Sequence, residues 1–251
     1  TCDSAEIPTD RRNTAYRAAE RFMQAAFLPE ESRPGLQLHI RKRIPAAAGL
    51  AGGSADAAGV LCGLSRLFPG RLTREELFAL AADIGADVPF CLQGGTGLCE
   101  GVGERLTLLP PWTGLSVLLC KPQQGLSTAA VFNLLKLDRL GRRPVQDRVL
   151  DAVRKQDLGL LAKATANVLE AVSTTIMPEL AAIRSQLAAA GAQVVLMSGS
   201  GPTVFGLFSR PESCEQAAWQ LAGSLPPGSS IWLSRTTAEG PHITSVGEQG
   251  S

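Results

Sequence analysis

The sequence has little of what builds a metal centre and no excess of charge of either sign. Its two histidines, His39 and His242, lie far apart in the chain and offer no zinc-type cluster. Lysine plus arginine (24) and aspartate plus glutamate (23) nearly balance, so the formal net charge is +1 at pH 7. Because no global basic field marks a nucleic-acid surface, we expect no nucleic-acid partner.

Long hydrophobic runs and a secretion signal are also missing. No uninterrupted apolar stretch approaches the roughly twenty residues that a membrane-spanning helix needs. The N-terminal stretch TCDSAEIPTDRRN lacks the charged and then apolar pattern of a signal peptide. We therefore expect a cytoplasmic protein without a membrane partner. An initiator Met is missing too, which favours a chain that begins inside a longer one.

Cysteine pairs of the C-x-x-C type are absent, although the chain has six cysteines. Because the chain is neither small nor visibly secreted, we expect reduced, buried thiols rather than a disulfide framework. These residues are Cys2, Cys62, Cys91, Cys99, Cys120 and Cys214.

The pattern that is present predicts helices and strands without regular alternation, which is typical of an α+β fold. An apolar stripe of period 3.6 predicts a helix within 13–27. Thr73 and Glu76 form a capping-box signature, which predicts a helix within 72–85 that Gly85 ends. Further helices are expected at 54–67, 149–155, 158–172, 178–190 and 211–222. Strands are expected at 36–42, within 95–109, and at 115–122, 192–197, 203–208 and 230–234.

The stretch RIPAAAGLAGGSADAAGVL, residues 43–61, places glycines directly before an alanine-rich helix. Backbone N–H groups of such a loop and of the first helical turn form an anion site. Gly49, Gly52 and Gly53 would supply the turn, and Ser54 would cap the helix while its hydroxyl faces a phosphate or metal. An ordinary loop with a capped helix is the alternative. The chain contains neither G-x-x-x-x-G-K-[ST] nor G-x-G-x-x-G.

Several segments in the expected order resemble those of the GHMP kinases, the family named for galactokinase, homoserine, mevalonate and phosphomevalonate kinases. Within that family the resemblance is to the kinases of 4-diphosphocytidyl-2-C-methyl-D-erythritol in the non-mevalonate isoprenoid pathway. The segments are PTDRRNTAYRAA (8–19), IPAAAGLAGGSADAAGVLCGL (44–64), IGADVPFCLQGGTGLCEGVGE (84–104), GLSTAAVFNLL (125–135) and VLMSGSGPTVFGLF (195–208).

The resemblance implies transfer of the γ-phosphate of ATP, with Mg²⁺, to the 2-hydroxyl of this small-molecule substrate. Asp87 matches the catalytic aspartate, Ser54 is a candidate metal ligand, and Asn13 borders the adenine. Thr128 and Phe132 match the cytidine pocket, and Ser198, Gly199, Ser200 and Gly201 match the C-terminal glycine loop. The implied ATP loop consists of Pro45, Ala46, Ala47, Ala48, Gly49, Leu50, Ala51, Gly52, Gly53, Ser54 and Ala55.

Each of these residues also has an ordinary structural interpretation. Asp87 could be a turn residue between a helix and a strand. Thr128 and Phe132 could be a helix N-cap and a core aromatic residue. The stretch 198–202 could be a tight connection between two strands.

The implied fold has two domains. Residues 1–141 would form an incomplete N-terminal ATP-binding domain like domain 2 of ribosomal protein S5. Residues 142–251 would form a ferredoxin-like C-terminal domain, after the polar, basic, proline-containing stretch 141–147. We expect a monomer or a homodimer.

Two departures from the family pattern bear on activity. Ser54-Ala55 stands where the family has paired serines, so one hydroxyl is missing. The family's N-terminal Lys-x-Asn and Asp-Gly-Tyr-His segments have no match, since no lysine precedes Lys42 and the one tyrosine, Tyr16, lies in a predicted helix. We therefore expect a chain that lacks the N-terminal segment and has weak or no activity alone. Another small-alcohol GHMP kinase, a nucleotide-binding chain without catalysis and a non-functional fragment remain as alternatives.

Overall fold

The computed structural model describes residues 1–27, 30–103, 105–136 and 140–244. It divides into two compact units, each made of separate stretches of chain. The helical unit comprises Thr1–Arg43, Ala51–Leu108 and the stretch from Ala238 onward. The sheet unit comprises Ile44–Leu50 and Leu109–Thr237. The units therefore do not divide at residue 141, because the strand that begins at Ser116 pairs with strands that follow residue 200.

The helical unit is built around four helices. They are α1 (Thr14–Ala26), α2 (Gly52–Leu67), α3 (Arg74–Ile84) and α4 (Val88–Gln93). A 3-10 turn at Glu30–Ser32 lies between α1 and α2 in the chain. A two-stranded sheet follows, formed by β1 (Thr96–Glu100) and β2 (Arg105–Leu109).

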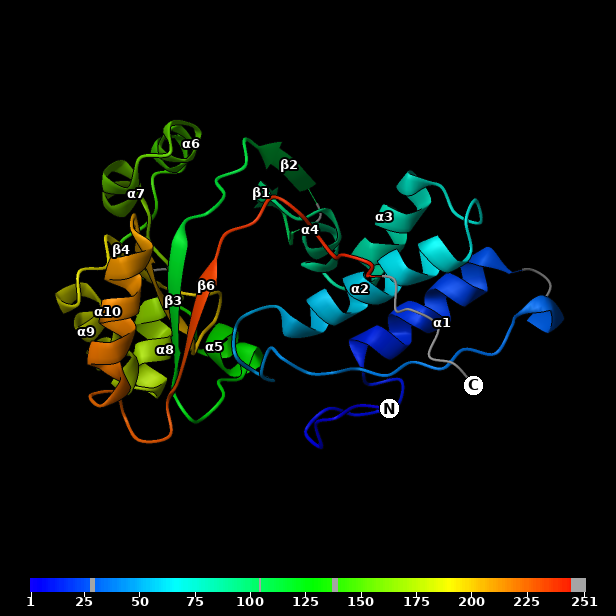
Figure 1. Ribbon diagram of the computed structural model, residues 1–251, viewed down its shortest axis with the longest axis horizontal. Coiled ribbons are helices and arrows are strands. Elements are labelled where there is room, and N and C mark those ends of the chain that lie inside the picture. The colour runs from blue at the N-terminus through cyan, green and yellow to red at the C-terminus, as the bar shows by residue number, and fades with distance from the viewer. Residues whose placement is uncertain (28–29, 104, 137–139, 245–251) are drawn as a thin grey trace. The chain divides into compact units, whose positions relative to one another are not determined.

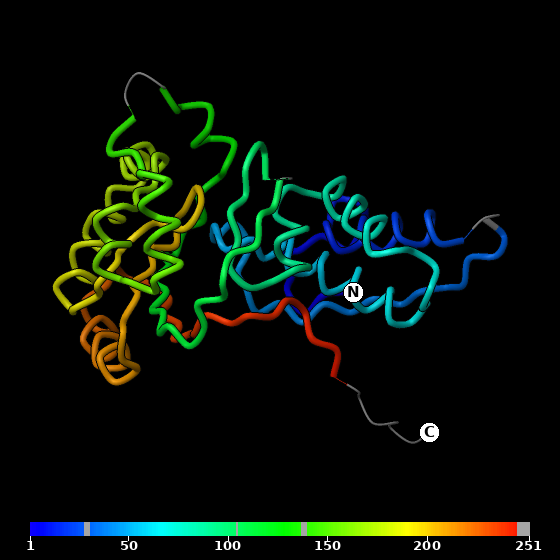
Figure 2. The backbone as a smooth tube through the Cα atoms, turned by 90° about the horizontal axis from the view of Figure 1, so that it is seen from above, coloured from blue at the N-terminus to red at the C-terminus, as the bar shows by residue number. Residues whose placement is uncertain are grey.

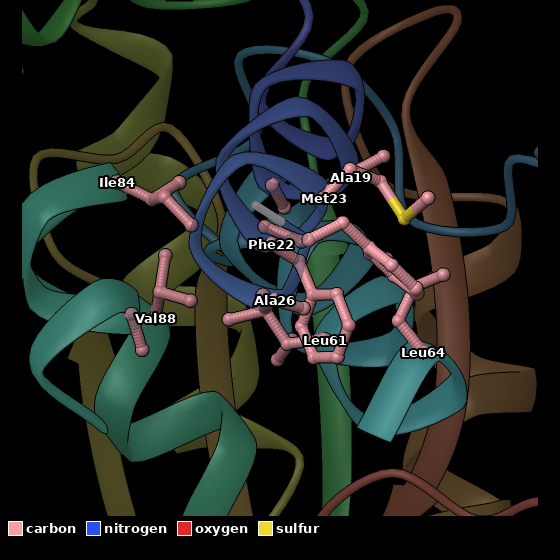
Figure 3. Close-up of a cluster of buried hydrophobic side chains, with 13 residues drawn as sticks. Ala19, Phe22, Met23, Ala26, Leu61, Leu64, Ile84 and Val88 are labelled. Carbon is pink, nitrogen blue, oxygen red and sulfur yellow. The ribbon is translucent and has the colours of Figure 1, made fainter. Parts of the chain in front are cut away.

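The core of the helical unit lies among the four helices, with α1 packed on α2 and α3, and α4 packed on α2 and α3 (Figure 3). Each residue of the predicted stripe on α1 is buried, which confirms the periodicity argument. Phe22 and Leu61 are fully buried, and alanines at 18, 57 and 58 let the helix backbones approach closely.

The predicted ends of α3 are confirmed. Thr73 Oγ1 accepts a hydrogen bond from Glu76 N at 3.2 Å, and Glu76 Oε2 accepts one from Thr73 N at 2.8 Å. The bonds that Thr73 N and Thr73 Oγ1 donate to the carboxylate hold the pKa of Glu76 below its usual value. Gly85 ends the helix, as expected.

The predicted strand at 36–42 is wrong, because its partners are too few. The segment runs as an extended chain alongside α1 (Figures 1 and 2). In the described part of the chain, its pairing is a single bridge between Ile40 and Cys2. Three backbone bonds tie it to the N-terminal residues: Thr1 N to Leu38 O, Ile40 N to Thr1 O and Asp3 N to Ile40 O.

The sheet unit contains one antiparallel sheet of order β4-β5-β3-β6. Its strands are β3 (Ser116–Lys121), β4 (Val194–Met197), β5 (Val204–Phe208) and β6 (Ser230–Arg235). Its helices are α5 (Thr128–Leu134), α6 (Gln146–Lys155), α7 (Leu158–Ala164), α8 (Glu170–Ile176), α9 (Glu179–Ala189) and α10 (Pro211–Ala222). Helices α9 and α10 pack on the sheet through one apolar cluster, and α7 contributes Leu158 and Leu161 to another (Figure 1).

One predicted helix of this unit is in fact two. The expected helix at 158–172 is interrupted after Ala164, and α8 starts only at Glu170. The interruption contains Asn167, whose side chain bonds to the backbone of residues 197 and 199. These tertiary bonds compete with helix continuation, as asparagine side chains do.

Two expectations about the whole chain can be compared with the structure. All six cysteines are free, as expected, but only Cys120 and Cys214 are buried and Cys99 is exposed. Among the described residues, no helix combines the length and apolar character that crossing a membrane requires.

Candidate functional site

The helix that follows the glycine stretch begins earlier than predicted. Gly52 is its first residue, so Ser54 lies in the first turn instead of capping it. Ala51 precedes the helix in the left-handed conformation (φ 49°) and provides no side-chain cap. The first intrahelical bond runs from Ala55 N to Ala51 O at 2.9 Å. The N–H groups of residues 52–54 thus have no partner within the helix and suit an anion.

The first half of the glycine stretch belongs to the sheet unit and is bonded to it through three successive carbonyl groups. Ala47 O accepts from Leu126 N at 3.4 Å, and Ala48 O accepts from Thr203 N at 3.3 Å. Gly49 O accepts from Ser198 Oγ at 2.8 Å. The ATP-loop candidates 47–49 and the glycine loop around Ser198 therefore lie together, although they are far apart in the sequence.

Gly49 is required by this close approach. Its φ is +71°, and a Cβ atom built on it would lie 2.5 Å from Gly201 O and 2.7 Å from Ser198 O. Those distances are impossible for a side chain against backbone oxygens. Glycine at position 49 therefore allows the glycine stretch to pack against the loop 198–201, in addition to any role in the approach of a phosphate.

The glycine loop 198–201 connects β4 to β5 as a tight turn. Ser198 N donates to Thr203 O at 2.8 Å, and Gly201 N donates to Ser198 O at 2.9 Å. Ser200 is 7% exposed, and its hydroxyl lies 2.8 Å from that of Thr128. The structure therefore brings the glycine loop to the start of α5, where the predicted cytidine residues begin.

The ordinary interpretation of Thr128 and Phe132 is wrong on both counts. Ser127, not Thr128, caps α5, through a 3.4 Å bond from Ala130 N to Ser127 Oγ. The Phe132 side chain is 54% exposed and lies outside the core. Both side chains are available to a ligand, Thr128 through its hydroxyl and Phe132 through a stacking face.

Asp87 lies in the helical unit, between α3 and α4, so it joins two helices instead of a helix and a strand. It precedes the first residue of α4, is exposed, and makes no capping bond with its carboxylate. Burial raises the pKa of Cys91 to about 11, and the Asp87 carboxylate contributes to the shift. Cys99 is exposed, but neighbouring atoms remove part of its hydration; this partial desolvation, followed by the Asp87 carboxylate, raises its pKa as well. An exposed carboxylate free of its own helix suits a proton acceptor.

Sequence reasoning missed an ion pair beside the glycine stretch. Lys42 Nζ pairs with Asp56 Oδ2 of α2, and the side chain of Lys42 is 6% exposed against 23% for Asp56. The two residues lie 14 positions apart, so no helical spacing indicates the contact. The pair ties the chain before the glycine stretch to the first turns of α2.

Asn13 has a clear structural role. Its Oδ1 caps α1 by accepting from Ala15 N at 2.8 Å, and its Nδ2 donates to Pro8 O at 2.8 Å. It also lines a cavity of about 790 Å³ in the helical unit, together with Tyr16, Met23 and Leu38.

In the described part of the chain, no three His, Cys, Asp or Glu side chains are grouped to hold a metal ion.

The predicted site residues are thus distributed over both units. Ala51–Ala55 and Asp87 belong to the helical unit. Pro45–Leu50, Thr128, Phe132 and Ser198–Gly201 belong to the sheet unit.

Comparison with known proteins places this arrangement in a family. The domain described as "GHMP kinases N terminal domain" matches residues 13–95, and that described as "GHMP kinases C terminal" matches residues 149–224. A protein of Caldicellulosiruptor saccharolyticus named 4-diphosphocytidyl-2-C-methyl-D-erythritol kinase is 42% identical over 221 residues, which are 88% of this chain and 75% of that protein. The chain belongs to the 4-diphosphocytidyl-2-C-methyl-D-erythritol kinase family of GHMP kinases.

Other members of this kinase family are similarly close. The protein of the same name from Lachnoclostridium phytofermentans is 41% identical over 91% of this chain and 77% of its own length. The crystal structure of a 4-(cytidine 5'-diphospho)-2C-methyl-D-erythritol kinase superposes with a TM-score of 0.74 at 34% identity, over 94% of this chain and 81% of that one.

The family fold extends to other kinases. The crystal structure of homoserine kinase from Cytophaga hutchinsonii gives a TM-score of 0.80 over 97% of this chain and 84% of that one, at 19% identity. At that identity the likeness concerns the fold alone. The α+β GHMP kinase fold expected from the sequence is confirmed.

Proposed function

We propose that this chain transfers the γ-phosphoryl group of ATP to the 2-hydroxyl of 4-diphosphocytidyl-2-C-methyl-D-erythritol, a step of the non-mevalonate route to isoprenoid precursors. The observation that carries the proposal is identity of 41–44% to kinases named for this substrate, over 82–91% of the chain. The location that we propose is the cytoplasm, and the assembly a monomer or homodimer.

The glycine stretch is proposed to bind the triphosphate. Its support is the set of first-turn N–H groups of α2 together with the helix dipole, both of which favour a negative charge. Phosphoryl transfer depends mainly on such positioning and charge stabilisation. We propose phosphate binding also for the glycine loop 198–201 of the sheet unit, which is bonded to Gly49. The N–H groups of Ser198 and Gly201 are used inside the loop, so those of Gly199 and Ser200 would serve this role.

Asp87 is proposed to accept or orient the proton of the attacking hydroxyl. Its carboxylate is exposed and makes no bond to its own helix, so it can reach a substrate hydroxyl. Thr128 and Phe132 are proposed to hold the cytidine, one by hydrogen bonding and the other by stacking.

Mg²⁺ is proposed to enter with ATP. Within the described residues, Ser54 Oγ has no hydrogen-bond partner, and no carboxylate or imidazole cluster competes for the ion. This fits Mg²⁺, which keeps several waters and binds through substrate phosphates and one or two protein ligands. When bound, the ion would neutralise charge on the phosphates.

The test is ADP release with ATP, Mg²⁺ and the cytidylyl substrate. Wild type should turn over weakly, and Asp87→Asn should lower this kcat by at least about 100-fold, the scale of general acid–base catalysis. Asp83→Asn is the matched control, since Asp83 is an exposed carboxylate on α3. It should keep wild-type kcat.

The same assay separates the alternatives. Turnover of homoserine or mevalonate in preference to the cytidylyl substrate would assign the chain to another GHMP activity. ATP binding by calorimetry without turnover of any of the three alcohols would indicate a nucleotide-binding chain. Turnover that Asp87→Asn leaves intact would contradict the role of Asp87.

A further inference from the structure

Four successive carbonyl groups in the glycine loop of the sheet unit have hydrogen-bond donors. Met197 O and Gly199 O accept from Asn167 Nδ2 at 2.8 and 2.7 Å. Ser198 O accepts from Gly201 N at 2.9 Å, and Ser200 O accepts from Ser173 Oγ at 3.1 Å. The negative ends of these four peptide dipoles are therefore turned toward protein donors.

Asn167 supplies two of the four bonds and is itself held in place. It lies between α7 and α8, and its Oδ1 accepts from Leu169 N at 2.9 Å. Because the oxygen is occupied by a backbone donor and the nitrogen faces two carbonyl groups, the orientation of the amide is unambiguous. Both N–H bonds of the amide are used.

The loop needs such a restraint because packing restrains it little at its centre. Gly199 has φ +54°, and a Cβ atom built on it would meet nothing closer than Gly49 O at 3.6 Å. Glycine peptides adopt either sign of φ at low cost. If the Gly199–Ser200 peptide turned over, its carbonyl oxygen would take the place of the Ser200 N–H group.

We propose that Asn167 is a positioning residue of the phosphotransfer site: by holding the carbonyl group of Gly199, it keeps the N–H group of the same peptide, that of Ser200, directed at the anionic substrate. This inference rests on the proposed function for the identity of the substrate.

The test variant is Asn167→Asp, which keeps the shape but replaces two donors by a carboxylate facing two carbonyl oxygens. At pH 8 its kcat/KM should fall about 100-fold, as expected for a displaced catalytic element. A carboxylate in such surroundings protonates more readily, and the protonated form regains one donor. The ratio of variant to wild-type kcat/KM should therefore rise severalfold between pH 8 and pH 6.

Taking that ratio cancels the titration of neighbouring groups. The charged side chains that line the same cavity as Asn167 are Arg142, Glu170 and Arg184. Glu170 and Arg184 form an ion pair at 2.8 Å. All three are present in both proteins.

The matched control is Gln186→Glu. Gln186 Nε2 donates to Ser224 O at 2.8 Å, so this change also removes an amide donor from a backbone carbonyl of the sheet unit, away from the glycine loop. Its kcat/KM should remain within about twofold of wild type at both pH values. If Asn167→Asp does not fold, Asn167→Ala, which removes both donors without adding a charge, is measured in its place, with an expected five- to tenfold loss in kcat/KM.

A second measurement is independent of turnover. Calorimetry with inorganic pyrophosphate should show about tenfold weaker binding to Asn167→Asp than to wild type at pH 8. A wild type that binds pyrophosphate but does not phosphorylate the cytidylyl substrate would refute the proposed function and leave the Asn167 role supported. Equal pyrophosphate affinities, an equal kinetic deficit at both pH values, or no pyrophosphate binding by wild type would overturn the role of Asn167.

Discussion

The hydroxyl groups of Thr128 and Ser200 lie 2.8 Å apart and share one hydrogen bond. It joins the first residue of α5 to the glycine loop, so the proposed cytidine residues and the proposed phosphate loop are linked side chain to side chain. Thr128 is exposed at the surface of the sheet unit, whereas Ser200 is nearly buried. A substrate group that bonds Thr128 would therefore also affect the loop.

Thr128→Val removes this bond while keeping the shape of the side chain. A neutral hydrogen bond contributes about 0.5–1.5 kcal/mol, so kcat/KM for the cytidylyl substrate should fall about three- to tenfold. Thr128→Ser keeps the hydroxyl and should retain activity. A Thr128→Val/Ser200→Ala cycle in which the two losses simply add would show that the bond has no role.

Gly49→Ala should destabilise the sheet unit, because its Cβ atom would overlap two backbone oxygens of the glycine loop. We expect a loss of about 3 kcal/mol or more in the free energy of unfolding, measured in urea. Gly35→Ala is the control, since a Cβ atom there meets nothing within 4 Å. Equal stabilities of the two variants would contradict the contact.

Ala51→Gly should raise the free energy of unfolding, whereas Gly49→Ala should lower it. Ala51 has φ +49°, a conformation that costs an L-residue about 1–2 kcal/mol and costs glycine little. We expect stabilisation of about 1 kcal/mol. Ala55→Gly, within the helix, should instead destabilise by about 0.5–1 kcal/mol. Urea titrations of both variants would show the two signs, and a destabilised Ala51→Gly would refute the argument.

The thiols near Asp87 report on its charge. Desolvation, followed by the Asp87 carboxylate, raises the pKa values of Cys91 and Cys99, so both thiols stay protonated at neutral pH. Asp87→Asn removes the negative charge and should lower both pKa values. The thiolate fraction, and with it the alkylation rate at pH 8.5, should rise about twofold or more.

Mass spectrometry of the alkylated peptides would resolve each site. The internal control is Cys120, whose pKa is raised to about 12 by burial and then by Cys214. Its rate should not change in Asp87→Asn. An unchanged rate at Cys91 and Cys99 would mean that the carboxylate does not act on them.

The Lys42–Asp56 pair should respond unequally to loss of either partner. Asp56→Asn leaves a nearly buried ammonium group without its counter-charge and should cost about 1–3 kcal/mol of unfolding free energy. Lys42→Met leaves a carboxylate that is already partly hydrated, so its cost should be smaller. Urea unfolding of both variants provides the comparison, and a larger loss in Lys42→Met would contradict the burial argument.

Much of the secondary structure could be predicted from the local sequence pattern alone. The stripe on α1 and the capping box of α3 depend on neighbours within one or two helical turns, and both were predicted correctly. The segment 36–42 has equally clear alternation, but a strand also needs partners, which alternation cannot supply. The interruption after Ala164 likewise depends on carbonyl groups of residues 197 and 199.

The site was predictable as a set of residues but not as an arrangement. Motif resemblance names Gly49 and Ser198, yet nothing in either motif indicates that they bond to each other. Asn167 and Lys42 carry no motif of their own, and their partners are 30 and 14 residues away. Contacts of this kind arise only from tertiary packing.

The division of the chain into units has a consequence for anyone who builds chimeric kinases. The sheet unit includes Ile44–Leu50, a stretch that the sequence inserts between two parts of the helical unit. A fragment of residues 109–237 would lack the carbonyl groups of Ala48 and Gly49, which accept bonds from Thr203 and Ser198. Exchange of the sheet unit between relatives therefore requires two crossovers in the glycine stretch, so that 44–50 is transplanted with 109–237.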